Sequence, residues 1–179
     1  MLEQMTKRLN AQPSFEAAVW GILDDAIALQ GAEFGTLQLR AGTRLLLVAQ
    51  RGFRSPFLSV FREVGADDGS TCGRTLRENA TVIVEDVDID EAYARFREVA
   101  RQAGYRSVAT TPLASPRGRV AGAVSTHFAN VHVPTPIEID TLRKYSMVAA
   151  DRLFVTLRGG SIEARAAAMN RDLYEALPT

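Results

Sequence analysis

Cys72 is the only cysteine in this 179-residue chain, and the residues around it could build one wall of a binding site. Ser70 or Thr71 can accept backbone N–H bonds at the start of a short helix that contains the cysteine. Asn79 suits the left-handed residue that ends such a helix, and residues 81–84 form an apolar run typical of a buried strand. A helix start with free N–H groups beside a buried strand is typical of a small-molecule pocket.

Seven residues are candidates for the lining of that pocket. Cys72 could have an acidified, nucleophilic thiol, although a lone cysteine is more often a small buried hydrophobe. His127 could hydrogen-bond a ligand or act as an axial haem ligand, and a satisfied core histidine is the more common case. Phe96 and Tyr105 could close the pocket or pack in the core. The full set is Cys72, Arg74, Asp86, Phe96, Tyr105, Ser107 and His127.

Arg74 indicates the polarity of the ligand. It lies near the start of the helix, where free N–H groups already favour negative charge. We therefore expect Arg74 and the turn beginning near Ser70 to meet an anionic or carbonyl part of a ligand. The same wall ends on the carboxylates Glu85 and Asp86.

Composition and charge exclude several classes of partner. An apolar content of 46% is enough for the core of an ordinary domain. The 21 basic and 21 acidic side chains balance and form no basic run, so we expect no nucleic-acid partner. No window approaches the roughly 18 apolar residues of a membrane span, and we predict a cytoplasmic protein without a membrane partner. A lone cysteine fits a reducing compartment and excludes a cysteine-based zinc cage within one chain.

Three aspartates, Asp86, Asp88 and Asp90, could suggest a calcium loop. Such a loop needs glycine at its sixth position and a bidentate glutamate at its twelfth, where this chain has Glu91 and Arg97. We therefore expect no metal site here. Asp88 or Asp90 is instead predicted to cap the helix that follows.

Hydrophobic periodicity and turn residues predict an alternation of helices and strands. The expected helices cover residues 15–30, follow Ser55-Pro56, cover 70–79 and 93–103, and follow Thr135 and Ser161. The expected strands are 34–40, 44–50, 81–84, 105–113 and 119–128, of which the longer four form two hairpins. We divide the chain into an amphipathic segment (1–12), a central domain (13–158) and a C-terminal helix (161–177).

Two local signals are more specific than the periodicity. Thr135-Pro136-Ile137-Glu138 is a capping box with proline at the first helical position, so a long helix begins there. Gly122 lies inside the last strand, where the missing side chain predicts a close approach of other atoms to the backbone.

Three strings, at residues 69–86, 104–113 and 122–128, resemble corresponding parts of the GAF domains of bacterial signalling proteins. The resemblance extends over about residues 15–157. It implies an α+β fold with a central antiparallel sheet of five or six strands. The terminal helices would cover one face of this sheet, and a ligand cavity would lie on the other face under the middle helices and loops.

Members of this family bind cyclic nucleotides, bilins, haem, amino acids or other metabolites, and the resemblance does not select one of them. The dispersed Asn, Lys, Phe, Asp and Glu signature of the cyclic-nucleotide binders cannot be placed here. Bilin-binding relatives commonly have histidine directly after the attaching cysteine, whereas Gly73 follows Cys72. We therefore expect no covalent cofactor, and a non-covalent small molecule of unknown identity.

These considerations predict a sensor module that binds a small molecule and passes its occupancy on through the terminal helices. No kinase, cyclase or phosphodiesterase segment is evident in the 179 residues, so the expected output partner is a separate protein such as a histidine kinase or regulator. One alternative is an enzyme similar to free methionine sulfoxide reductases, which use several cysteines where this chain has one. Another is a dimerisation module with a collapsed cavity.

Apolar stripes at both ends of the chain predict a homodimer. Met5, Leu9, Met169 and Leu173 are the expected contacts. The alternative is that the last helix folds back and covers its own domain. If the dimer uses other residues, the long helix after Thr135 is the next candidate.

Overall fold

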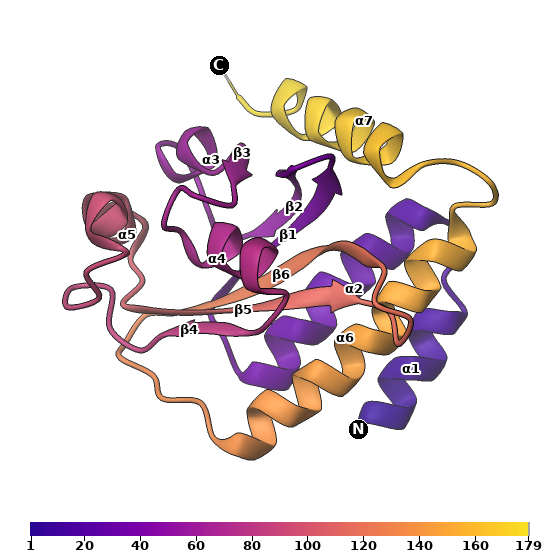
Figure 1. Ribbon diagram of the computed structural model, residues 1–179, viewed down its shortest axis with the longest axis horizontal. Helices are drawn as coiled ribbons and strands as arrows, with labels where there is room; N and C mark the ends of the chain where they lie inside the picture. The colour runs from indigo at the N-terminus through magenta and orange to yellow at the C-terminus, as the bar shows by residue number, and fades with distance from the viewer. Residues whose placement is uncertain (179) are drawn as a thin grey trace.

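The computed structural model describes residues 1–178, which form a curled six-stranded sheet with helices on both of its faces (Figure 1). The helices are α1 (Leu2–Asn10), α2 (Phe15–Gln30), α3 (Phe57–Val60), α4 (Thr71–Glu78), the 3₁₀ helix η1 (Ala94–Phe96), α5 (Arg97–Ala103), α6 (Pro136–Thr156) and α7 (Ile162–Glu175). The strands are β1 (Phe34–Ala41), β2 (Arg44–Arg51), β3 (Glu63–Gly65), β4 (Val82–Val84), β5 (Ser107–Ala114) and β6 (Val120–Phe128). The predicted α+β class is confirmed.

All neighbouring strands are antiparallel, in the order β3-β2-β1-β6-β5-β4. Both predicted hairpins are present, and β1 pairs with β6 at the centre of the sheet, where Thr36 is opposite Ser125. A Cβ at Gly122 would lie 2.0 Å from the carbonyl oxygen of Gln38 on β1. This contact is the close backbone approach that the glycine predicts.

Capping side chains and left-handed residues define the ends of the helices. Ser14 accepts a hydrogen bond from Ala17 N at the start of α2, and Gly31 ends that helix in the left-handed conformation. The predicted capping box of Thr135 and Glu138 is formed at the start of α6. The predicted helix over residues 93–103 is instead divided into η1 and α5.

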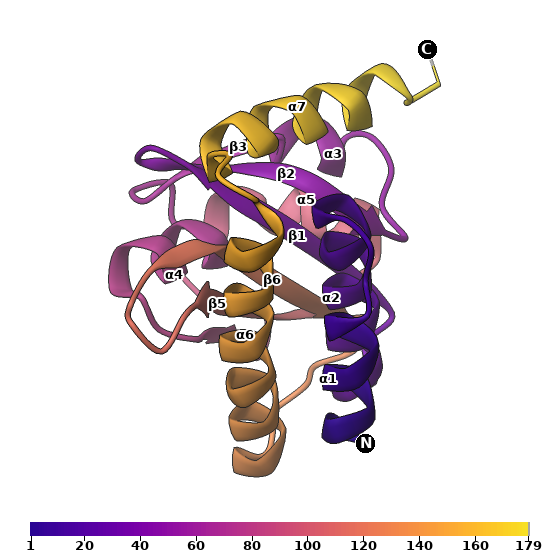
Figure 2. The same cartoon turned by 90° about the vertical axis from the view of Figure 1, so that its right-hand side faces the viewer.

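Helices α1, α2 and α6 cover one face of the sheet (Figures 1 and 2). A partly buried network joins them, because Arg8 Nη2 and the Tyr145 hydroxyl both donate to Asp25, each at 2.7 Å. Tyr145 is fully buried, and its hydroxyl has no other hydrogen-bond partner in the described chain. None of the helices in residues 1–178 combines the length and apolar character that a membrane span requires.

Helix α7 folds back across β1 and β2 of its own chain (Figure 2). Met5, Leu9 and Met169 are buried within the chain, and Leu173 packs against its core. The residues expected to contact a second copy are therefore already covered. The alternative, in which the last helix covers its own domain, describes this structure.

Candidate functional site

Helices α3, α4, η1 and α5 cover the second face of the sheet, and we call these four elements the lid (Figure 1). The layer between the lid and the sheet is rich in aromatic rings, which come mainly from the lid and its connecting loops. The rings are those of Phe53, Phe57, Phe61, Tyr93, Phe96 and Tyr105. This is the face on which the family resemblance predicts a ligand cavity.

His127 of β6 lies at the centre of the aromatic layer. Its ring centroid is 4.8 Å from those of Phe53 and Tyr105 and 5.7 Å from that of Phe57. The hydroxyls of Tyr93 and Tyr105 form a hydrogen bond of 2.8 Å beside it. Burial lowers the pKa of His127 to about 3, so the imidazole is neutral at physiological pH.

A chain of hydroxyl groups lines the layer next to α4. Thr110 Oγ1 donates to Thr71 Oγ1 at 2.8 Å and lies 2.8 Å from Ser125 Oγ. The sulfur of Cys72 lies 3.3 Å from the same Ser125 oxygen. Burial raises the pKa of the Cys72 thiol, so it is held protonated as a weak hydrogen-bonding group rather than activated as a nucleophile.

Two buried polar atoms in this layer have no hydrogen-bond partner within the described residues: Gln38 Oε1 and His127 Nδ1. Both side chains are almost fully buried, at 1% and 3% exposure. Within residues 1–178, the only partner of the Gln38 side-chain amide is the carbonyl oxygen of Phe61, 3.4 Å from Nε2. Leaving such a group unpaired costs about 1–3 kcal/mol. Buried polar groups without partners are uncommon in folded proteins, so these two atoms mark the layer as a candidate binding site.

The strand register places these two atoms on one face of the sheet. Gln38 pairs with Ala123, and Ala123 is four positions before His127 on the same strand. At about 3.3 Å per residue, the two side chains stand roughly 13 Å apart along the sheet. Thr36 and Ser125 lie between them on the same face. This row of groups could contact an elongated small molecule at both of its ends.

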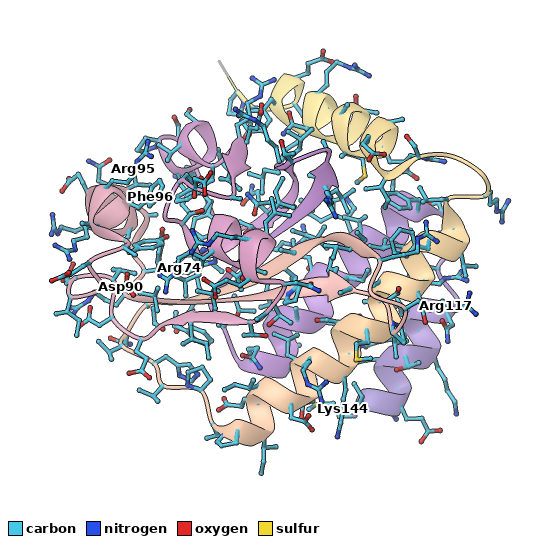
Figure 3. The ribbon with its side chains drawn as sticks, viewed as in Figure 1. Arg74, Asp90, Arg95, Phe96, Arg117 and Lys144 are labelled. Atoms are coloured by element: carbon cyan, nitrogen blue, oxygen red, sulfur yellow. The ribbon has the colours of Figure 1, made fainter. Side chains whose placement is uncertain are left out.

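Of the seven residues predicted to line the site, four come together in this layer: Cys72, Phe96, Tyr105 and His127. The other three lie outside it, and their polar groups are paired within the chain. Arg74 contacts Asp90 at 3.4 Å, and Figure 3 shows this pair beside α4.

Asp86 and Ser107 have structural partners at the end of β4. Asp86 accepts a 2.6 Å hydrogen bond from Arg106 Nη2, and this bond lowers the pKa of the carboxyl group. Ser107 Oγ donates to the carbonyl oxygens of Val84 and His132. These contacts hold the end of the sheet and the loop after β6 together.

The sequence analysis missed Gln38, Thr36, Thr110 and Ser125 as residues of the layer. The sequence does contain a pattern that could have identified two of them, because Thr36 and Gln38 alternate with Leu37 and Leu39 along β1. Such alternation normally indicates a solvated polar face. Here the lid covers that face, so the polar side chains are buried.

Two surface pockets reach the edge of the layer. One of about 540 Å³ is bounded by Phe96, together with Arg95 and Asp67. Figure 3 shows Arg95 and Phe96 next to each other at this edge. The other, of about 110 Å³, is bounded by Phe53 and Phe57.

A sequence model described as the GAF domain matches residues 12–153. Among solved structures, the GAF domain of an Acinetobacter phosphoenolpyruvate-protein phosphotransferase aligns with a TM-score of 0.73 and 14% identity, covering 89% of this chain and 94% of its own. The corresponding Coxiella burnetii domain gives 0.73 and 18%, covering 93% and 94%.

A third similar structure is an enzyme. The free methionine-R-sulfoxide reductase of Neisseria meningitidis, solved with its substrate, has a TM-score of 0.72 and 17% identity, covering 88% of each chain. At these identities the similarity establishes the fold alone. No curated protein matches the chain.

Proposed function

This chain belongs to the GAF-domain family, and from that premise we propose that it is a regulatory sensor that binds a small molecule between its sheet and its lid. The observation that carries the proposal is the pair of unpartnered buried atoms, Gln38 Oε1 and His127 Nδ1. A ligand that supplies a partner to each would remove their desolvation cost. The aromatic rings around His127 favour a ligand with a flat, largely apolar body.

We propose that α7 carries the binding signal towards the end of the chain. The Tyr174 hydroxyl donates to the carbonyl oxygen of Leu58 in α3, and the Arg62 guanidinium lies 4.4 Å from the Tyr174 ring centroid. Leu58 directly follows Phe57, whose ring contacts His127. A ligand that displaces Phe57 would therefore move α3, and α3 would move α7. A separate output protein, such as a histidine kinase, could read this change in the cytoplasm.

We propose binding rather than reductase chemistry because Cys72 is a buried thiol with a raised pKa. A single cysteine also cannot form the intramolecular disulfide that such chemistry uses. The glycine after it has a structural role, since a Cβ at Gly73 would lie 2.3 Å from the carbonyl oxygen of Gly65. A larger residue there would push α4 away from β3.

Replacing Gln38 by leucine tests the binding site. In the ligand-free protein Q38L is expected to raise the free energy of unfolding by about 1 kcal/mol, because it removes a buried unpaired oxygen. The native protein is screened against a panel of amino acids, nucleobases and haem, and at least one compound is expected to raise its melting temperature. Q38L should not show this rise. The compound that stabilises the native protein should also change the hydrogen-exchange rate of the α7 amides.

Gln4, exposed on α1, provides the control, and Q4L should retain the response of the native protein. If no compound stabilises the native protein while Q38L is still more stable, the layer is a collapsed core. The domain would then be a structural module rather than a sensor.

We propose that a second copy of the chain docks on the outward face of α6. Ile137, Val148 and Val155 are 79%, 36% and 67% exposed on that face. Lys144 and Asp151 lie on either side of Val148, so an antiparallel pair of these helices would place each lysine near the partner's aspartate. The α6 face thus combines an apolar ridge with self-complementary charge.

Sedimentation equilibrium tests this pairing at high micromolar concentration. The native protein is expected to be a dimer of 19.5 kDa chains, and the double variant V148E/V155E a monomer. V131E, which changes an exposed valine in the loop after β6, should remain dimeric. A monomeric native protein would contradict the pairing, and a dimer that survives V148E/V155E would place the interface elsewhere.

A further inference from the structure

A separate pocket of about 330 Å³ lies where the α1–α2 link, the end of α6 and the start of α7 meet. Figures 1 and 2 both show these three segments at the same end of the helical layer, away from the lid. We call it the arginine pocket. Its walls are formed by Pro13, Ser14, Phe15, Glu16, Arg152, Val155, Thr156, Arg158 and Arg165.

The arginine pocket has a net positive charge. Arg152, Arg158 and Arg165 face a single acidic residue, Glu16, so the formal charge of its walls is 3 − 1 = +2. Glu16 is itself engaged by Arg165 Nη1 at 2.5 Å. Among the described residues, neither Arg152 nor Arg158 forms an ion pair with an acidic side chain. The start of α2, a helix of 16 residues, adds positive potential at the same place.

The guanidinium groups also have unused donors. Arg152 Nη2 donates to the carbonyl oxygen of Gln12 at 2.7 Å, but its buried Nε has no partner within residues 1–178. No hydrogen bond or ion pair of the Arg158 side chain is formed in that part of the chain. The pocket thus offers charged N–H groups from two elements to an acceptor that the protein does not provide.

From this geometry we propose that the arginine pocket binds a phosphoryl group, as inorganic phosphate or as a phosphate monoester. A tetrahedral dianion matches the charge of +2 and has enough oxygens to accept from several guanidinium groups at once. Pro13 gives the pocket an apolar wall that could contact the organic part of a monoester. Bound phosphate would link α2, α6 and α7.

Titration of the full chain with inorganic phosphate tests the site, with ionic strength held constant by potassium chloride. Backbone amide shifts and thermal unfolding report binding. The native protein is expected to show saturable shifts near Glu16 and Arg158 and a rise in melting temperature. R158Q should weaken phosphate binding by about tenfold or more, since it removes a charged hydrogen-bond donor from the pocket.

R171Q is the matched control, because Arg171 is an exposed arginine of α7 outside the arginine pocket and its loss changes the net charge equally. It should bind phosphate as the native protein does. R158K keeps the positive charge but loses the planar guanidinium group, so it should bind phosphate with intermediate affinity. It replaces R158Q in the test if R158Q does not fold. Phenyl phosphate binding more tightly than phosphate would identify a monoester site, and equal binding would identify a free-phosphate site.

Two results would overturn the proposal. One is the absence of saturable phosphate binding to the native protein beyond the effect of chloride. The other is equal weakening by R158Q and R171Q, which would show that phosphate responds only to the overall charge of the chain. Neither result depends on the ligand of the lid layer, because that layer lies on the opposite face of the sheet.

Discussion

Lowering the pH from about 7 to about 4.5 is expected to reduce the free energy of unfolding by roughly 2.5 kcal/mol through His127 alone. Its pKa falls from 6.5 to about 3 on folding because the ring is buried among apolar and aromatic groups. Above about pH 8, neither the folded nor the unfolded state binds a proton at His127. Below pH 6.5 the unfolded chain gains a proton that the folded one does not, so stability falls until the folded pKa is reached.

Chemical denaturation of the native protein and of H127L across this pH range measures the effect. The variant should lose the acid dependence due to His127, whatever its stability at neutral pH. Carboxyl groups with lowered pKa, such as Asp86 and Asp140, contribute equally to both proteins and cancel in the difference. H132L, which removes the half-buried second histidine, is the control and should retain the acid dependence. Parallel curves for native protein and H127L would show that His127 is solvated.

Replacement of Asp25 by alanine is expected to cost about 3 kcal/mol of stability. It leaves the hydroxyl of Tyr145 buried without an acceptor and removes the carboxylate that holds Arg8. The cost is smaller than for a fully buried ion pair, because the Arg8 side chain is 64% exposed and remains solvated. Urea denaturation measures the change, and hydrogen exchange of α1 should become faster.

The neighbouring residue provides a matched control. Asp24 binds Arg51 through two hydrogen bonds of 2.8 and 3.0 Å, but this pair is about half exposed. D24A should therefore cost less than about 1 kcal/mol. Equal costs for D24A and D25A would mean that burial adds nothing to the network and that α1 is held by apolar packing alone.

The sequence by itself determined the elements that depend on near neighbours. Ser70 and Asn79 act at the ends of α4 as their types predict, and Thr135 forms its box with Glu138. These signals are reliable because a cap or turn is decided by groups within three or four residues. The order of elements and three matching strings then indicated the family.

The lid layer was only partly predictable. Cys72, Phe96, Tyr105 and His127 were expected in a cavity wall, and they do share the covered face of the sheet. Arg74 was expected to meet a ligand, but its guanidinium lies against Asp90, sixteen residues further along the chain. Helical position fixes where a long side chain starts, whereas the loop that packs against it decides which charge it meets.

Only the tertiary structure decided which face of β1 is covered and which arginines meet. Alternation along a strand shows that Thr36 and Gln38 share a face, but the covering helices come from later in the chain. The arginine pocket likewise joins the α1–α2 link to Arg158 and Arg165, roughly 150 positions away. Buried polar atoms and clusters of like charge arise from such distant contacts, which the spacing of residues along the chain does not encode.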